Sequence, residues 1–241
     1  MSAFLTLDSL SYRTPDGRGL FEGLTLSLGA ERTGLVGANG VGKTTLLKLA
    51  MGELEPTAGA VVRSGRLAML RQTMSPPPGA SAAELIGVAL DLARLDRITA
   101  GQGTEHDLAE ADWELPARLD VALAELGLAG LELARPTATL SGGEATRAQL
   151  AGLIVRQPDV LVLDEPTNNL DADARRIVAE RLRTWRGGAI VVSHDRTLLR
   201  AMDRIVELSS LGAQVYGGGY DLYVERKAAE EAAAVRELAS A

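Results

Sequence analysis

The alternation of apolar and polar residues predicts antiparallel strands at the start of this chain. Alternating stretches, which are typical of strands with one buried face, lie at residues 4–7, 9–12 and 24–28. The turn sequence Pro15-Asp16-Gly17 separates the first two stretches from the third, so neighbouring strands are expected to run in opposite directions. Further strands are predicted at residues 32–36, 59–63, 67–70, 204–208 and 213–216.

Two later runs indicate a different kind of sheet. Residues 160–163 and 189–192 are short and wholly apolar, as strands that are buried on both faces must be. Residues 171–185 between them have the pattern of a helix, which makes a parallel crossover the expected connection. The fold class predicted from these patterns is α/β, with a mainly parallel core sheet and an N-terminal antiparallel part.

The middle of the chain changes to helical periodicity. Pro76-Pro77-Pro78-Gly79 interrupts any regular element, and residues 81–140 follow as a mainly helical segment. Helices are predicted at residues 84–95, 112–126 and 144–155, with a glycine-rich break at 101–104. The last residues, 221–241, are rich in alanine and glutamate and predict a helix that leaves the domain. The expected division is 1–74 for the antiparallel part and the start of the core, 75–140 for an inserted helical subdomain, 141–220 for the rest of the core, and 221–241 for the final helix.

A glycine-rich stretch lies between the strand predicted at 32–36 and a helix predicted at 44–51. It reads Gly37-Ala38-Asn39-Gly40-Val41-Gly42-Lys43-Thr44 and is followed by Thr45. Such glycines let backbone N–H groups turn inward, so that an anion sits on them and on the positive end of the helix. We expect Lys43 to contact the β- and γ-phosphates of a nucleotide and the Thr44 hydroxyl to ligate Mg²⁺. The alternative is a glycine turn that binds nothing, and the flanking strand and helix argue against it.

Acidic residues and a histidine follow the two apolar strands. Asp164 ends the run at 160–163, where ligands of open α/β sheets bind, and would hold Mg²⁺ directly or through water. Glu165 would point towards the γ-phosphate and an attacking water, for which a carboxylate can act as general base. His194 comes after the run at 189–192 and is expected near the phosphates.

A second potential phosphate site precedes the helix at 144–155. Ser141, Gly142 and Gly143 expose backbone N–H groups at a helix N-terminus, although this motif taken on its own favours Ser141 acting only as a helix cap. One chain does not need two γ-phosphate sites unless one of them serves a nucleotide held by another subunit.

Two further residues are candidates for nucleotide binding only because the motifs above are present. Gln72 follows the strand at 67–70 and would reach Mg²⁺ or the water, and Tyr12 would stack on an adenine ring. Without the other motifs, they would be a strand-end amide and an edge aromatic.

Composition restricts the possible functions. The net charge of −7 argues against a broad nucleic-acid surface on this chain, and the lack of cysteine excludes disulfides and thiolate metal sites. The first ten residues have no charged leader and no long apolar run, and no stretch approaches membrane-spanning length. Together these features predict a cytoplasmic protein.

The motifs occur in the order and spacing of an ABC-type ATPase, which the chain resembles over nearly its whole length. The resemblance implies a P-loop cassette in which two copies face each other head to tail around two ATP molecules, with Mg²⁺. Each ATP would lie between the loop at Gly37 of one cassette and Ser141-Gly142-Gly143 of the other. It further implies that Glu165 and Gln72 act on the water, that His194 contacts the γ-phosphate, and that Asp171 communicates across the interface. No motif residue departs from the active pattern, so hydrolysis is predicted.

The branch of the family is indicated by Asn168-Asn169-Leu170-Asp171 and by Tyr216–Tyr223 before the charged final helix. Both are similar to the ABC-F branch, whose members act on the ribosome in translation or antibiotic resistance. The expected partners are therefore a second cassette, in a longer chain or as a homodimer, and the ribosome. The segment between Gln72 and Ser141 is short for the additional arm that many members insert, and one cassette only is present. The alternatives are the nucleotide-binding subunit of a membrane exporter and a pure binding module.

Overall fold

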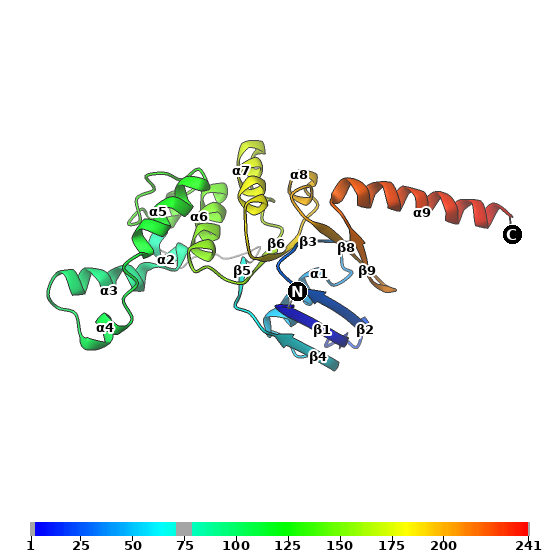
Figure 1. Cartoon of the computed structure of the whole chain (residues 1–241), viewed down its shortest axis with the longest axis horizontal. Helices are drawn as coiled ribbons and strands as arrows, with labels where there is room; N and C mark the ends of the chain where they lie inside the picture. The colour runs from blue at the N-terminus through cyan, green and yellow to red at the C-terminus, as the bar shows by residue number, and fades with distance from the viewer. Residues whose placement is uncertain (1–2, 71–78, 241) are drawn as a thin grey trace.

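The computed structural model describes residues 3–70 and 79–240, and it arranges them around two sheets (Figure 1). A three-stranded sheet has the order β2-β1-β4, and a six-stranded sheet has the order β5-β6-β7-β3-β8-β9. The strands are β1 (Leu5–Arg13), β2 (Gly19–Leu28), β3 (Arg32–Val36), β4 (Ala58–Arg63), β5 (Leu67–Leu70), β6 (Val160–Asp164), β7 (Gly188–Val192), β8 (Arg204–Ser209) and β9 (Gly212–Gly217). The helices are α1 (Lys43–Met51), α2 (Ala82–Ile86), α3 (Ala89–Thr99), α4 (Glu105–Ala109), α5 (Leu115–Glu125), α6 (Gly142–Val155), α7 (Ala172–Arg183), α8 (Arg196–Leu199) and α9 (Tyr220–Ser240), with a 3₁₀ turn at Thr137–Thr139.

The smaller sheet is antiparallel, as the alternating stretches predicted. β1 pairs with β2 on one side and with β4 on the other, both in opposite directions. The two stretches expected at 4–7 and 9–12 form the single strand β1, whose register shifts around Ser9, a residue with a positive φ of 50°. β4 and β5 follow one another in sequence but belong to different sheets, so the short turn between them carries the chain from one layer to the other.

The larger sheet is parallel except at one edge. β5, β6, β7, β3 and β8 run in the same direction, and β9 returns antiparallel along β8. Alternate residues of its strands face different layers: Leu161 and Leu163 pack into a cluster with α5, α6 and α7, whereas Val160 and Val162 pack into a cluster with β1, β2 and α1. Every residue of β6 and β7 is buried, which confirms the strands predicted from wholly apolar runs.

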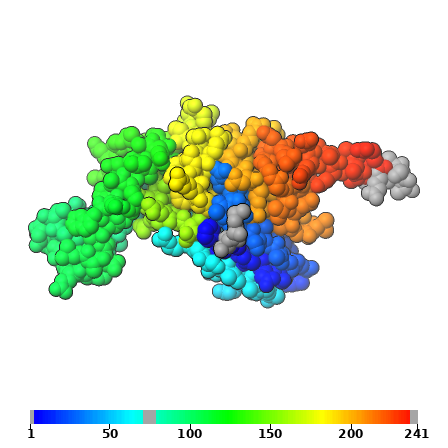
Figure 2. All heavy atoms as spheres, in the orientation of Figure 1, coloured from blue at the N-terminus to red at the C-terminus, as the bar shows by residue number. Residues whose placement is uncertain are grey.

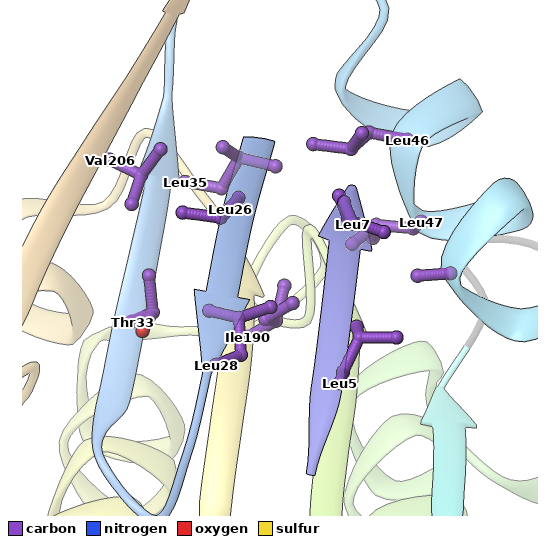
Figure 3. A pocket seen from close by; sticks show the side chains of 11 residues that line it. Leu5, Leu7, Leu26, Leu28, Thr33, Leu35, Leu46, Leu47, Ile190 and Val206 are labelled. Atoms are coloured by element: carbon purple, nitrogen blue, oxygen red, sulfur yellow. The ribbon is translucent and has the colours of Figure 1, made fainter. Parts of the chain in front are cut away.

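The second cluster is closely packed. Figure 3 shows leucines of β1, β2 and α1 pointing towards Ile190 and Val206 of the larger sheet. The void left between them is about 10 Å³, and its lining is apolar apart from Thr33. A space of this size and chemistry stays dry, and it is typical of a well-filled protein interior.

The helical segment departs from its predicted pattern. The single helix expected at 84–95 is wrong: α2 ends at Gly87, which has a φ of 81°, and α3 starts at Ala89. Gly87 takes the left-handed conformation that closes helices, and its N–H donates to Ala83 and Glu84 carbonyls. α4, which was not predicted, starts with a capping box in which Thr104 and Asp107 bond reciprocally.

The molecule has two extensions at opposite ends. α3 and α4 form a lobe at one end in Figure 1 and Figure 2, and α9 projects from the β8–β9 hairpin at the other. The start of α9 is anchored, because Lys227 donates to Glu207 at 2.8 Å and the Tyr216 hydroxyl donates to Glu230 at 2.9 Å. No helix in the described residues has the length and apolar character needed to cross a membrane.

Candidate active site

The predicted motifs meet at the carboxyl ends of β3, β6 and β7. Because these strands are parallel neighbours, the loops that follow them reach the same edge of the sheet. A cavity of about 620 Å³ lies there. The predicted residues that line it are Asn39, Gly40, Gly42, Lys43, Thr44, Thr45, Asp164, Glu165 and His194.

The glycine-rich loop is shaped by its contact with β8. Gly37 has a φ of 149°, and a Cβ on it would lie 2.3 Å from the Leu208 carbonyl oxygen. No side chain fits there, so glycine lets the loop start flush against the neighbouring strand. At the other end of the loop, Gly42 has a φ of 108° and precedes α1, where a Cβ would lie 2.8 Å from the ring of Phe21. The sequence expectation of a tight backbone curl before a helix is met at both ends.

Lys43 points back into the loop. Its Nζ donates to the carbonyl oxygens of Gly37 at 2.7 Å and Ala38 at 3.1 Å. Lys43 is 8% exposed. Burial lowers the pKa of Lys43, and the negative charges of Glu165 and Asp164 raise it by less. An ammonium held by neutral carbonyls has no carboxylate bound to it, so its charge is available to an anionic ligand of the loop.

Thr44 and Asp164 form the donor pair expected for Mg²⁺. The Thr44 hydroxyl donates to Asp164 Oδ2 at 2.9 Å, and the Asp164 carboxylate is 3% exposed. A hydroxyl and a carboxylate suit Mg²⁺, which binds few protein ligands and completes its shell with phosphate and water. Within the described ranges, no cluster of three or more His, Asp or Glu side chains could hold a metal without a nucleotide.

Glu165 and His194 lie next to each other in the lining of the cavity. Glu165 has a φ of 49° and its N–H donates to the Val192 carbonyl at 2.9 Å, so β7 fixes the turn that aims its side chain. Glu165 Oε1 lies 3.5 Å from His194 Nε2, and the side chain of Glu165 is 13% exposed. Burial raises the pKa of Glu165, which the charge and backbone N–H of His194 partly oppose. A carboxylate with a raised pKa is a better proton acceptor than an exposed one.

The Ser141 motif is folded as a capping box. Glu144 N–H donates to Ser141 Oγ at 3.1 Å, and Ser141 N–H donates to the Glu144 carboxylate at 2.8 Å. Gly142 and Gly143 lie beside Asn169. Ser141, Gly142 and Gly143, hereafter called the signature, do not line the cavity at Lys43. The capping role is therefore observed, and a phosphate-binding role for another nucleotide stays a prediction.

The remaining predicted residues lie in different places. Asp171 caps α7 by accepting from the Ala174 N–H at 2.8 Å, and its interface role stays a prediction. Tyr12 is 9% exposed within the cluster of β1, β2 and α1 and does not line the cavity, so adenine stacking also stays a prediction. Gln72 lies outside the described residues.

The structure adds cavity residues that the sequence patterns did not identify. Thr14, Arg18 and Leu20 reach the cavity from the β1–β2 hairpin, and Asn168 reaches it from the loop after Glu165. Asn168 follows the carboxylates by a few positions and was within reach of the sequence argument. Nothing in the sequence of the hairpin indicates which of its side chains face the loop after β3.

Comparison with known proteins agrees with this geometry. A family profile described as ABC transporter matches residues 22–168, which include the loop, Asp164 and Glu165. The chain belongs to the ABC transporter family. Two curated relatives of this cassette are the tylosin resistance ATP-binding protein TlrC of Streptomyces fradiae and the ATP-binding protein Uup of Escherichia coli. TlrC is 36% identical, and the match covers 95% of this chain and 46% of TlrC. Uup is 34% identical, and the match covers 88% of this chain and 36% of Uup.

The cassette therefore spans less than half of the length of these two relatives. Solved structures show the same fold. An ATP-binding subunit of an ABC transporter superimposes with a TM-score of 0.72 at 22% identity, covering 92% of this chain and 98% of its own. A dimeric ATP-binding cassette bound to ADP and phosphate gives a TM-score of 0.71 at 19% identity. The match covers 88% of this chain and 98% of that cassette.

Proposed function

We propose that this cassette binds ATP with Mg²⁺ and hydrolyses it at an interface with a second cassette. The observation that carries the proposal is the convergence of Lys43, the Thr44–Asp164 pair and the Glu165–His194 pair on one cavity. These are a phosphate-binding cation, a Mg²⁺ donor set and a general base, and they lie at the edge of the sheet where nucleotides bind.

Each residue has a distinct part in this proposal. Loop N–H groups and Lys43 bind the phosphates, and Lys43 exchanges its carbonyl partners for phosphate oxygens. Thr44 and Asp164 would hold Mg²⁺, which when bound offsets charge on the β- and γ-phosphates. Glu165 accepts a hydrogen bond from the attacking water, and His194 orients the Glu165 carboxylate and faces the γ-phosphate.

A second cassette supplies what this chain does not place in its own cavity. Ser141, Gly142 and Gly143 lie away from Lys43, and the curated relatives are about twice as long as this chain. We propose a head-to-tail pairing, in which the signature N–H groups of one cassette meet the nucleotide of the other. From the likeness to TlrC and Uup we further propose an ABC-F-type protein of the cytoplasm that acts on the ribosome in translation or antibiotic resistance.

The nucleotide part is tested by binding and turnover together. Lys43→Ala should weaken Mg-ATP binding by at least about tenfold, since a buried charge contact to phosphate is lost. Lys48→Ala is the matched control, because Lys48 lies on the same helix with its side chain exposed. Glu165→Gln should bind ATP normally and lose turnover. Full turnover by Glu165→Gln would contradict the assigned general base.

The ribosome part needs a separate experiment. Protein carrying Glu165→Gln is incubated with ATP, ribosomes and membrane vesicles, and the fractions are separated by sedimentation. Nucleotide-dependent sedimentation with ribosomes supports the proposed role. Retention by membranes instead would indicate the subunit of a transporter, and retention by neither would contradict both roles for this part of the protein.

A further inference from the structure

The β1–β2 hairpin carries a cation to the rim of the cavity. Arg18 lines the cavity, and its Nη2 donates to the Gly40 carbonyl oxygen at 3.3 Å. Gly40 lies in the middle of the phosphate-binding loop, so the guanidinium sits directly beside that loop on the side of the small sheet. Lys43, in contrast, enters the loop from α1.

The turn around Arg18 is held in one conformation. Thr14 N–H and Thr14 Oγ1 both donate to the Arg18 carbonyl, at 2.9 and 3.1 Å, and Gly17 N–H donates to the Thr14 carbonyl at 2.8 Å. These bonds fix the backbone of the residue that carries the guanidinium. A fixed backbone lowers the entropy lost when the side chain binds a ligand.

In the part of the chain that the structure describes, the charge of Arg18 has no acidic partner. No carboxylate of the described residues forms an ion pair with it. The pKa of Asp16 is lowered mainly by a hydrogen bond from Thr14, and the charge of Arg18 contributes least. Within residues 3–70 and 79–240, one of its five N–H donors bonds to Gly40, which leaves the others able to contact a ligand. The negative charges of Asp164 and Glu165 act on the pKa of Lys43.

We propose that Arg18 is a further binding residue for the nucleotide, and that it contacts the phosphate chain from the side opposite α1. A guanidinium is suited to phosphate oxygens because its N–H donors form a planar fork. The inference rests on the proposed nucleotide site. It assigns to the hairpin an electrostatic role, which differs from base stacking by Tyr12.

Equilibrium binding of ATP and GTP in the presence of Mg²⁺ tests the proposal. Arg18→Ala should weaken both nucleotides by the same factor, about five- to tenfold, because an exposed charge contact to phosphate is lost whatever the base. Arg13→Ala is the matched control: Arg13 lies on the same hairpin, is 61% exposed and does not line the cavity. A loss for ATP but not for GTP would show a base contact and overturn the proposal.

Two further variants separate phosphate binding from support of the loop. Arg18→Lys keeps the charge and should restore part of the affinity, whereas Arg18→Gln keeps a donor for Gly40 without the charge and should bind as weakly as Arg18→Ala. The affinity of the unsubstituted protein should also fall more steeply with salt than that of Arg18→Ala. Full affinity in Arg18→Gln or Arg18→Ala would overturn the role of Arg18 alone. Absence of nucleotide binding by the unsubstituted protein would overturn the proposed function as well.

Discussion

At the residue scale, the site consists of polar side chains that are largely buried and therefore need hydrogen-bond partners within the protein. Lys43 bonds to backbone carbonyls, and the Thr44 hydroxyl bonds to Asp164. Glu165 has a positive φ of 49°, a conformation that non-glycine residues rarely adopt. A strained and buried carboxylate is costly for folding, which indicates that its position serves the chemistry of the site.

The cost of burying Glu165 predicts a pH-dependent effect on stability. Its pKa is raised, so the folded protein binds a proton more tightly than the unfolded chain and loses stability as Glu165 ionises. Glu165→Gln should therefore raise Tm near neutral pH, and the gain should vanish well below about pH 4, where the carboxyl of the unfolded chain is protonated as well. Glu22→Gln, at a glutamate that is 85% exposed, is the control. A lower Tm for Glu165→Gln at neutral pH would contradict the burial argument.

At the element scale, the helical segment is joined to the core through α6. α6 packs against α2 and α5 and also contributes to the cluster under the larger sheet. α6 approaches α2 closely at Gly152, where a Cβ would lie 2.0 Å from the Ile86 carbonyl oxygen. The backbones of the two helices are therefore in direct contact at this crossing. A backbone atom cannot move aside by changing rotamer, as a side chain could.

This contact predicts that Gly152→Ala destabilises the protein although alanine is the better helix former. We expect a loss of about 1–3 kcal/mol in the free energy of unfolding, as is typical of overpacked cores. Chemical denaturation measures it. Gly217→Ala is the control, since open space surrounds a Cβ at that glycine. Equal stability of Gly152→Ala and the unsubstituted protein would show that α2 moves away freely.

At the scale of the whole molecule, the nucleotide cavity and the signature belong to different places on one chain. Gly142 is exposed at the start of α6, and a Cβ on it would approach nothing closer than Asn169 at 3.6 Å. A substitution there leaves the packing of the cassette intact. It therefore reports on what the signature does for a partner.

Mixing two inactive variants tests the proposed pairing. Lys43→Ala removes the ammonium group that we propose binds phosphate. Gly142→Asp places a carboxylate where the phosphate of a partner's nucleotide would bind, and an acidic side chain at a helix N-terminus does not destabilise the helix. A head-to-tail pair of the two variants contains one intact site, so the mixture should regain ATPase activity that neither shows alone. The activity of the unsubstituted protein should rise faster than linearly with concentration. No recovery on mixing, with both variants folded, would contradict the shared site.

The sequence predicted the sheets better than the helical segment. Wholly apolar runs such as 160–163 have one physical solution, a strand covered on both faces, and β6 adopts it. The stretch at 84–95 was misassigned because its apolar periodicity continues through Gly87, whose left-handed conformation ends α2. The capping box of Thr104 and Asp107 is a local sequence signal for the start of α4, which hydrophobic periodicity does not contain.

By itself, the sequence determined the chemistry of this protein: the glycine-rich loop with Lys43 and Thr44, the acids after one buried strand and the histidine after another. Local rules were enough, because loop residues and strand ends are set by their immediate neighbours. Only the tertiary structure decided which distant groups meet. It placed Arg18 beside Gly40, buried Tyr12 outside the lining of the cavity, and left Ser141 out of the lining to which Lys43 belongs. These outcomes depend on how the two sheets and the helical segment pack, and no local pattern of residues encodes that packing.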